Sequence, residues 1–350
     1  SDVCARPGPA AGGDSEVSPS VKALMTRVLI ALCFVALLPG VASAQGARHA
    51  VLIQGASGEP TFAKQHRGWL DQLATTFREK FKMDASQLTV MAEQAGEGEQ
   101  RATAENVRAT FDRLAKTLKP EDVLFVMLIG HGTAEGTAAK FNLVGPDLTV
   151  ADWKAVLTPI RSRVVFVNSS SASFPFAAGL TGDRRIIITS TSTPAQKYAT
   201  VFADGFVQAL NAPAADLDKN TRVSMWEAFF FASRVVKQYF EQKGLLVTER
   251  ALLEDNGDGV GREAMSATGE DGTLATMTYL DAGVETKATD PALQMLFQKQ
   301  ELLTLQIDDL KRKKPSMPEA EYAAAWEKLM VELATVGAEI RAKGLRRGEC

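Results

Sequence analysis

The chain alternates between short runs of consecutive hydrophobic residues and longer stretches in which hydrophobic residues recur at helical spacing. The short runs occupy residues 50–54, 88–91, 123–129, 163–167 and 185–190. Runs of this kind are typical of strands that are buried on both faces. The helical stretches cover residues 62–81, 104–118, 149–157, 200–210 and 225–240. This alternation predicts an α/β fold, with a mostly parallel sheet and helices on both of its faces.

The hydrophobic pattern changes after residue 262. Residues 263–290 are rich in Gly, Ser and Asp, and we expect them to form a linker. Residues 291–343 return to a helical spacing that is interrupted by a basic, proline-containing segment at 311–318. This pattern predicts a C-terminal helical hairpin or short coiled coil. The hairpin either packs on its own domain or binds a partner, which includes self-association through its helices.

The N-terminal residues differ from the rest of the chain. Residues 1–24 are rich in Pro, Gly and Ser and lack an initiator methionine, so we interpret them as a non-native or mis-started upstream segment. Residues 25–44 combine a short basic region, an apolar run and the small-residue motif Ala42-Ser43-Ala44, which predicts a signal peptide cut after Ala44. The apolar run is too short to span a bilayer. We therefore expect a secreted or periplasmic protein without a stable membrane anchor.

Charge and cysteine content narrow the function classes. The 350 residues carry a formal net charge of -3, and only 7% of them are aromatic, which argues against a nucleic-acid partner. Of the three cysteines, Cys4 and Cys33 precede the expected cleavage point and leave Cys350 alone. The expected mature protein therefore has no internal disulfide framework, no thiolate zinc site and no cysteine nucleophile.

Two of the buried strands end in residues that commonly take part in catalysis. Residues 123–129 lead into Gly130-His131-Gly132, and residues 163–167 lead into Asn168 and the serines that follow it. Ligands of open α/β sheets bind beyond the carboxyl ends of the strands. The pattern therefore predicts a hydrolase-type site in which His131 and Ser170 face the same edge of the sheet.

The order of these motifs resembles the caspase-fold cysteine peptidases, and within them the legumain-like branch, over residues 45–262. The resemblance implies a caspase-like sheet with His131 as the catalytic histidine, Ser170 at the position of the nucleophile and the backbone of Gly132 as an oxyanion donor. It also places Ser57 where legumains carry an asparagine that supports the histidine.

The chain departs from the family at three positions of this motif. Ser170 replaces the cysteine, Asn168 replaces the acidic residue before it, and Ser173 replaces the following glycine. A serine hydroxyl is a weak nucleophile that needs a histidine oriented by a carboxylate, whereas a cysteine ionises readily beside a histidine. These departures favour a catalytically degenerate homologue that binds a peptide or a protein. One alternative is an active hydrolase or endopeptidase that uses Ser170 with His131.

A second candidate site follows the spacing of an EF-hand calcium loop. Oxygen-bearing side chains occupy its positions 1, 3, 5, 9 and 12, namely Asp216, Asp218, Asn220, Ser224 and Glu227. Thr221 stands where the loop requires glycine. The competing interpretation is a capping box in which Ser224 and Glu227 begin a helix. A calcium-stabilised interaction module is thus a further alternative, and Ca²⁺ is the only cofactor that the sequence suggests. A shorter acidic loop at 254–259 is either a turn or part of another ion site.

Overall fold

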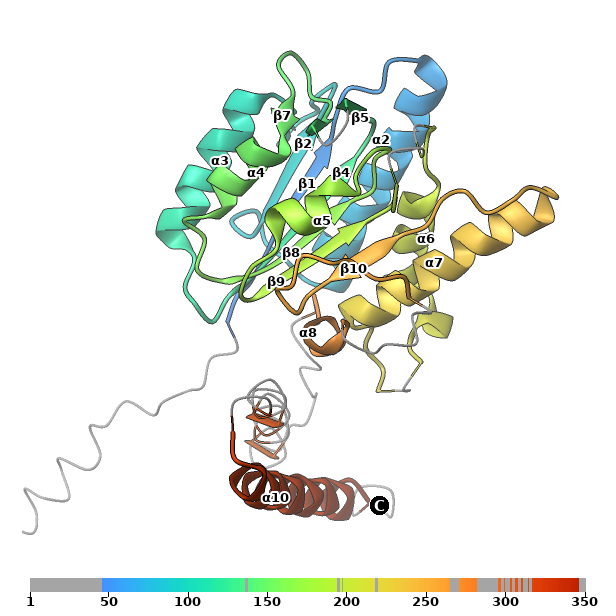
Figure 1. Cartoon of the computed structure of the whole chain (residues 1–350). Coiled ribbons are helices and arrows are strands. Elements are labelled where there is room, and N and C mark those ends of the chain that lie inside the picture. The colour runs from blue at the N-terminus through green and yellow to red at the C-terminus, as the bar shows by residue number, and fades with distance from the viewer. Residues whose placement is uncertain are drawn as a thin grey trace, which may run out of the picture. The chain divides into compact units, whose positions relative to one another are not determined.

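The computed structural model describes residues 46–345, with gaps at 136–137, 194–195, 197, 218–219, 265–270 and 282–294 and with only isolated residues between 297 and 316. The expected upstream segment and signal peptide lie outside the described residues. Most of the first arm of the expected hairpin lies outside them as well. The described residues form a seven-stranded sheet and a separate three-stranded sheet (Figure 1).

The large sheet has the strand order β10-β9-β8-β4-β1-β2-β3. Its strands are β1 (Arg48–Gln54), β2 (Leu88–Ala92), β3 (Gln100–Arg101), β4 (Val123–Ile129), β8 (Arg163–Asn168), β9 (Arg185–Thr189) and β10 (Leu252–Glu254). Neighbouring strands pair in parallel, except that β10 runs antiparallel to β9. The mostly parallel α/β sheet is therefore confirmed. The sequence pattern missed β3 and β10, which lie at the two edges and are too short to show a periodicity.

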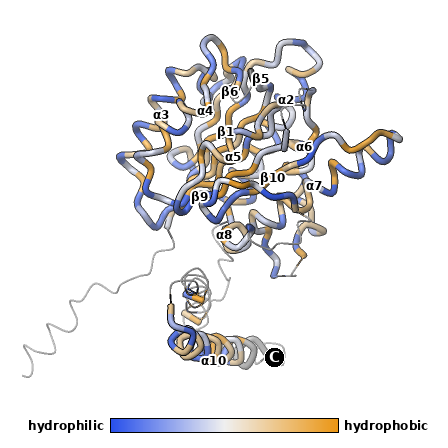
Figure 2. Tube along the Cα trace, in the orientation of Figure 1, coloured by the Kyte–Doolittle hydropathy of each residue, from blue (hydrophilic) through white to orange (hydrophobic). Residues whose placement is uncertain are grey.

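Helices cover both faces of this sheet, as expected. One face carries α2 (Pro60–Thr75) with the π-helical turn Thr76–Lys80, α6 (Phe202–Ala209) and α7 (Met225–Gln242), and the other carries α3 (Ala104–Thr117), α4 (Val150–Leu157) and α5 (Pro175–Leu180). Successive residues of β4 alternate between the two cores, with Phe125 and Met127 in one and Leu124 and Val126 in the other. Figure 2 shows the hydrophobic residues concentrated on the central strands.

Two residues separate the small sheet from the end of β4. It consists of β5 (Gly132–Glu135), β6 (Ala138–Phe141) and β7 (Leu148–Thr149), all antiparallel. Phe141 lies against the loop that follows β1, where a Cβ on Gly55 would come within 2.8 Å of its ring and 2.1 Å of the Asn142 oxygen. Only glycine therefore lets the loop after β1 approach the small sheet. This contact fixes the position of residues 55–59 beside His131.

The expected linker at 263–290 contains a folded part. Residues 271–281 include the short helix α8 (Thr273–Thr276), and Leu274 and Leu280 are buried in the core under α7. The α/β domain thus extends to Asp281 rather than ending at residue 262. A Gly- and Asp-rich composition marks loops, but it does not exclude a loop whose few leucines are buried.

The second arm of the expected hairpin is the long helix α10 (Glu319–Leu345). The rings of Tyr322 and Trp326 stack one turn apart on it, with their centroids separated by 5.9 Å. Within the described part of the chain, no helix combines the length and the hydropathy that crossing a membrane requires.

Candidate functional site

The two residues expected to form the site lie at one edge of the sheet. β4 and β8 are parallel neighbours whose register pairs Leu128 with Asn168, and the N–H of Ser169 continues the ladder to the Leu128 oxygen. His131 follows β4 and Ser170 follows β8. The sheet therefore brings the ends of both strands together, as the sequence predicted from two parallel strands.

His131 is anchored by the backbone of Ser57. Its Nε2 lies 3.1 Å from the carbonyl oxygen of Ser57. Because a carbonyl oxygen only accepts hydrogen bonds, Nε2 carries the hydrogen, and the lone pair of the neutral ring is on Nδ1. Ser57 thus contacts His131 through its main chain, whereas the resemblance implies support from the side chain at this position. This contact does not depend on the side chain at position 57.

A second histidine, which we did not expect from the sequence, completes this cluster. His66 of α2 is buried, its Nδ1 lies 3.1 Å from Ser57 Oγ, and its ring centroid lies 5.1 Å from that of His131. Burial and, to a lesser extent, the neighbouring His131 lower the pKa of His66 to about 4. The sequence did contain a signal, because His66 stands on the apolar face of its helix, one turn after Phe62 and one turn before Leu70.

Ser170 is not arranged as a nucleophile. Its side chain is only 1% exposed, and its Oγ donates a hydrogen bond of 2.6 Å to Oδ1 of Asn168. The backbone N–H of Ser170 donates to the same oxygen at 3.0 Å. Among the described residues, His131 makes no hydrogen bond to Ser170. The amide of Asn168 therefore holds the hydroxyl that a general base would have to activate.

The expected oxyanion donor is also engaged within the protein. The N–H of Gly132 donates to Ser171 Oγ at 3.3 Å, and the same hydroxyl donates back to the Gly132 oxygen at 3.0 Å. A Cβ on Gly132 would lie 2.3 Å from the Ser171 oxygen and 2.7 Å from Ser170 Oγ, so this approach requires glycine. An oxyanion hole works because its donors point at the developing charge. Here the N–H of Gly132 is bonded to Ser171 Oγ, and the N–H of Ser170 is bonded to Asn168 Oδ1, so neither N–H points at a substrate.

The rest of the serine-rich loop is held by hydrogen bonds to Ser190 and Thr191, which follow β9. The Oγ of Ser173 accepts the N–H groups of Ser190 and Thr191 at 3.1 and 3.2 Å, and Ser190 Oγ donates to the Ser170 oxygen at 2.7 Å. All of these side chains are buried. Ser173 thus links the loop to the segment that follows the neighbouring strand and restricts its movement.

The candidate calcium loop uses two of its expected ligands to begin a helix. Ser224 and Glu227 form the capping box of α7, with Ser224 Oγ accepting from the Glu227 N–H at 3.2 Å and Glu227 Oε2 accepting from the Ser224 N–H at 2.8 Å. Glu227 Oε1 also accepts from the Leu217 N–H at 2.8 Å. These contacts fit the competing interpretation, in which Glu227 belongs to the capping box.

The first half of the same loop has the turn that the spacing implies. The carboxylate of Asp216 accepts the N–H groups of Asn220 and Thr221, and Thr221 has the left-handed φ of 71° that glycine would favour. Asp218 lies outside the described residues. Among the residues that the structure does describe, no group of three His, Cys, Asp or Glu side chains is placed to hold a metal ion.

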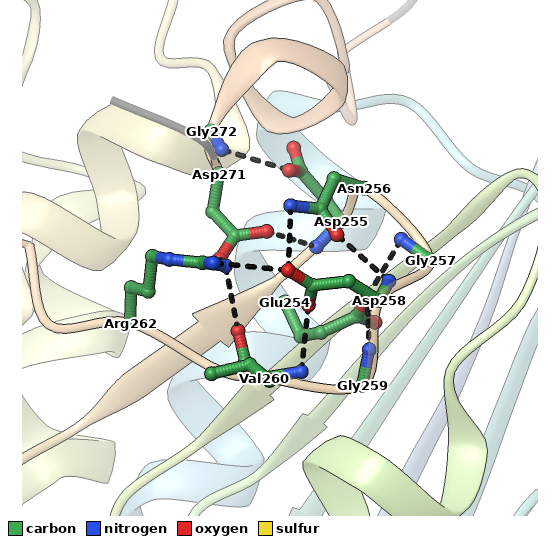
Figure 3. A network of polar contacts seen from close by, with 10 residues as sticks. All are labelled: Glu254, Asp255, Asn256, Gly257, Asp258, Gly259, Val260, Arg262, Asp271 and Gly272. Atoms are coloured by element: carbon green, nitrogen blue, oxygen red, sulfur yellow. Dashed lines mark hydrogen bonds and ion pairs between the residues drawn. The ribbon is translucent and has the colours of Figure 1, made fainter. Parts of the chain in front are cut away.

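The acidic loop after β10 forms a network of polar contacts in which one arginine pairs with two carboxylates (Figure 3). Arg262 donates to Asp258 at 2.9 Å, to the Val260 oxygen at 2.9 Å and to Asp271 at 2.6 Å. Glu254 accepts the N–H of Gly257 at 2.7 Å, which closes the turn. The guanidinium thus pairs with Asp258 and Asp271, and backbone N–H groups bind Glu254 and Asp255, so these contacts favour a turn over an ion site.

Comparison with known proteins adds little to this geometry. No family model matches the chain, and no curated protein matches it. Among solved structures, the fold is similar to the crystal structure of the protein GSU0716 from Geobacter sulfurreducens. That match has a TM-score of 0.42 and 11% sequence identity, and it covers 67% of this chain and 98% of the other. A similarity of this level carries no argument about family or activity.

Proposed function

We propose that this protein is an exported, non-catalytic homologue of the legumain-like peptidases that binds an extended peptide, or a segment of a protein, beside His131. The observation that carries the proposal is the hydrogen bond from Ser170 Oγ to Asn168, which occupies the hydroxyl at the nucleophile position. The engaged N–H of Gly132 supports the same conclusion. Attack by Ser170 would require its hydroxyl to leave Asn168 and bond to His131. It would also require the N–H of Gly132 to leave Ser171 and point at the developing oxyanion.

The strand after His131 offers a place for the peptide. β5 is an edge strand of the small sheet, and the N–H and carbonyl of Gly132 turn away from β6 toward Ser171. Because backbone groups alternate along an antiparallel strand, those of Ala134 point to the same outer side. Ser171 already binds the outward groups of Gly132, which leaves those of Ala134 for the main-chain hydrogen bonds by which an edge strand can bind an extended peptide. We expect the ligand to add to β5 as a further strand.

An active hydrolase is the alternative, and one observation favours it. Nε2 of His131 carries the hydrogen that binds the Ser57 carbonyl, and no hydrogen bond within the described structure occupies Nδ1. A free lone pair is what a general base needs. The alternative requires the serine loop to rearrange so that Ser170 leaves Asn168 and meets this nitrogen.

Assays of both binding and cleavage of a peptide library by the full chain distinguish a peptide-binding protein from an active hydrolase. We expect the wild type to bind extended peptides without cleaving them and Ser170→Ala to bind equally well. Ala134→Pro should weaken binding, because proline removes the outward N–H and is tolerated at a sheet edge. Thr133→Ser on the same strand is the matched control and should bind normally. Cleavage by the wild type that Ser170→Ala abolishes would establish the hydrolase instead.

A further inference from the structure

Two of the three histidines of this chain lie together at the candidate site. His131 comes from the end of β4 and His66 from α2, and their ring centroids are 5.1 Å apart with an interplanar angle of 66°. Both rings are held by the same residue, Ser57, which contacts His131 through its carbonyl oxygen and His66 through its hydroxyl. Two imidazoles therefore lie together, and one nitrogen of each ring is not bonded to Ser57.

The anchored nitrogens have the partners that metal-bound histidines usually have. A histidine that binds a metal through one nitrogen commonly donates its other N–H to a carbonyl, carboxylate or water, which fixes the ring. His131 donates through Nε2 to the Ser57 carbonyl, and His66 Nδ1 is within hydrogen-bond distance of Ser57 Oγ. Within the described structure, His131 Nδ1 and His66 Nε2 have no hydrogen-bond partner. These two nitrogens are therefore available as ligands.

The separation of the rings suits one shared ion. Zinc binds histidine nitrogen at about 2.0–2.1 Å in tetrahedral geometry, which places the centres of two imidazoles on one ion roughly 5 Å apart. The observed centroid distance is 5.1 Å.

We propose that His66 and His131 bind a divalent transition-metal ion of the zinc type, through His66 Nε2 and His131 Nδ1. No third His, Cys, Asp or Glu of the described structure joins them, so the remaining coordination positions are open to water or to a group of a bound ligand. The ion takes the lone pair that a general base would use, so metal binding and catalysis by His131 exclude each other. The proposal does not depend on whether Ser170 is active.

Calorimetric titration of the full chain with Zn²⁺ tests this site. All variants carry Cys4→Ser, Cys33→Ser and Cys350→Ser, so that thiolates bind no zinc, and no polyhistidine tag is used. We expect one ion per chain and a loss of about tenfold or more in affinity on His131→Ala or His66→Gln. His49→Ala, at the third histidine of the chain, is the matched control and should bind zinc as the parent does.

His66 is buried, so its replacement also needs a test of folding. Glutamine keeps a polar side chain near Ser57, and the melting temperature of each variant in the presence of a chelator shows whether the domain still folds. Absorption by Co²⁺ in place of zinc reports tetrahedral coordination directly in the folded variants. An unchanged zinc affinity in folded His66→Gln, or an equal loss in His49→Ala, would overturn the proposal. Peptide binding is measured separately in chelator, so the two proposals fail independently.

Discussion

Nε2 of His131 donates a hydrogen bond of 3.1 Å to the carbonyl oxygen of Ser57, which is 74 positions earlier in the chain. The two residues follow β4 and β1, which are parallel neighbours in the centre of the sheet. The bond selects one neutral form of the imidazole, with its hydrogen on Nε2. The fold therefore decides which nitrogen of His131 is available to a base, a ligand or a metal ion.

Because this support comes from the main chain, Ser57→Ala should leave His131 in place. We expect the ¹⁵N shifts of the His131 ring to keep the Nε2–H form in the variant. The same change removes the hydroxyl beside His66 and Gln54, so the free energy of unfolding should fall by about 1–2 kcal/mol in urea. A changed tautomer of His131 in folded Ser57→Ala would show that the side chain, rather than the carbonyl, holds the ring.

Ser171 should determine whether a nucleophile at position 170 can use the backbone donor of Gly132. In a background that carries Ser170→Cys and Cys350→Ser, adding Ser171→Ala releases the Gly132 N–H. A peptide aldehyde forms an adduct whose oxygen needs such a donor, so we expect its affinity to rise by about tenfold or more. Ser169→Ala, added to the same background, is the control. Equal aldehyde affinities in the two variants would mean that Gly132 does not serve as an oxyanion donor.

The sequence predicted the sheet and the neighbouring positions of His131 and Ser170, because long apolar runs report burial and parallel strands end at one edge. It did not predict the partners of the polar groups. A hydroxyl at position 170 can meet His131 or Asn168, and the hydrophobic pattern of the sequence does not distinguish these partners. His66 was missed for a related reason, since a histidine on the apolar face of a helix is usually a core residue.

Glu249 should make the stability of the domain depend on pH. Its carboxylate is buried and accepts the N–H groups of Val201 and Phe202 at the start of α6, and burial raises its pKa to about 7. A raised pKa means that the folded protein holds the proton more tightly than the unfolded chain does. Stability from this group is present below the unfolded pKa and is lost as the pH rises from about 4.5 to about 7.

We therefore expect the free energy of unfolding to fall over this pH range by up to about 3 kcal/mol from Glu249 alone. In Glu249→Gln the decline should be smaller, because glutamine does not titrate. Asp255, whose pKa burial raises to about 6, contributes a decline of the same sign, and His66, whose pKa is lowered to about 4, contributes a rise. Both remain in this variant, so the assignment rests on the difference between the variant and the wild type. Glu241→Gln, at an exposed position of α7, is the control and should keep the full decline. An undiminished pH dependence in Glu249→Gln would contradict the assignment.

Ser224 and Asp216 separate the two interpretations of the EF-hand-like loop. If Ser224 mainly caps α7, Ser224→Ala should destabilise the domain by about 1 kcal/mol in calcium and in chelator alike. Glu227 is committed to the same capping box, so we expect the wild type to melt at the same temperature in both buffers. A bound ion would instead raise the melting temperature by mass action, and Asp216→Ala would abolish that rise. Thermal melting of the three proteins with and without calcium therefore decides between a calcium loop and a helix cap.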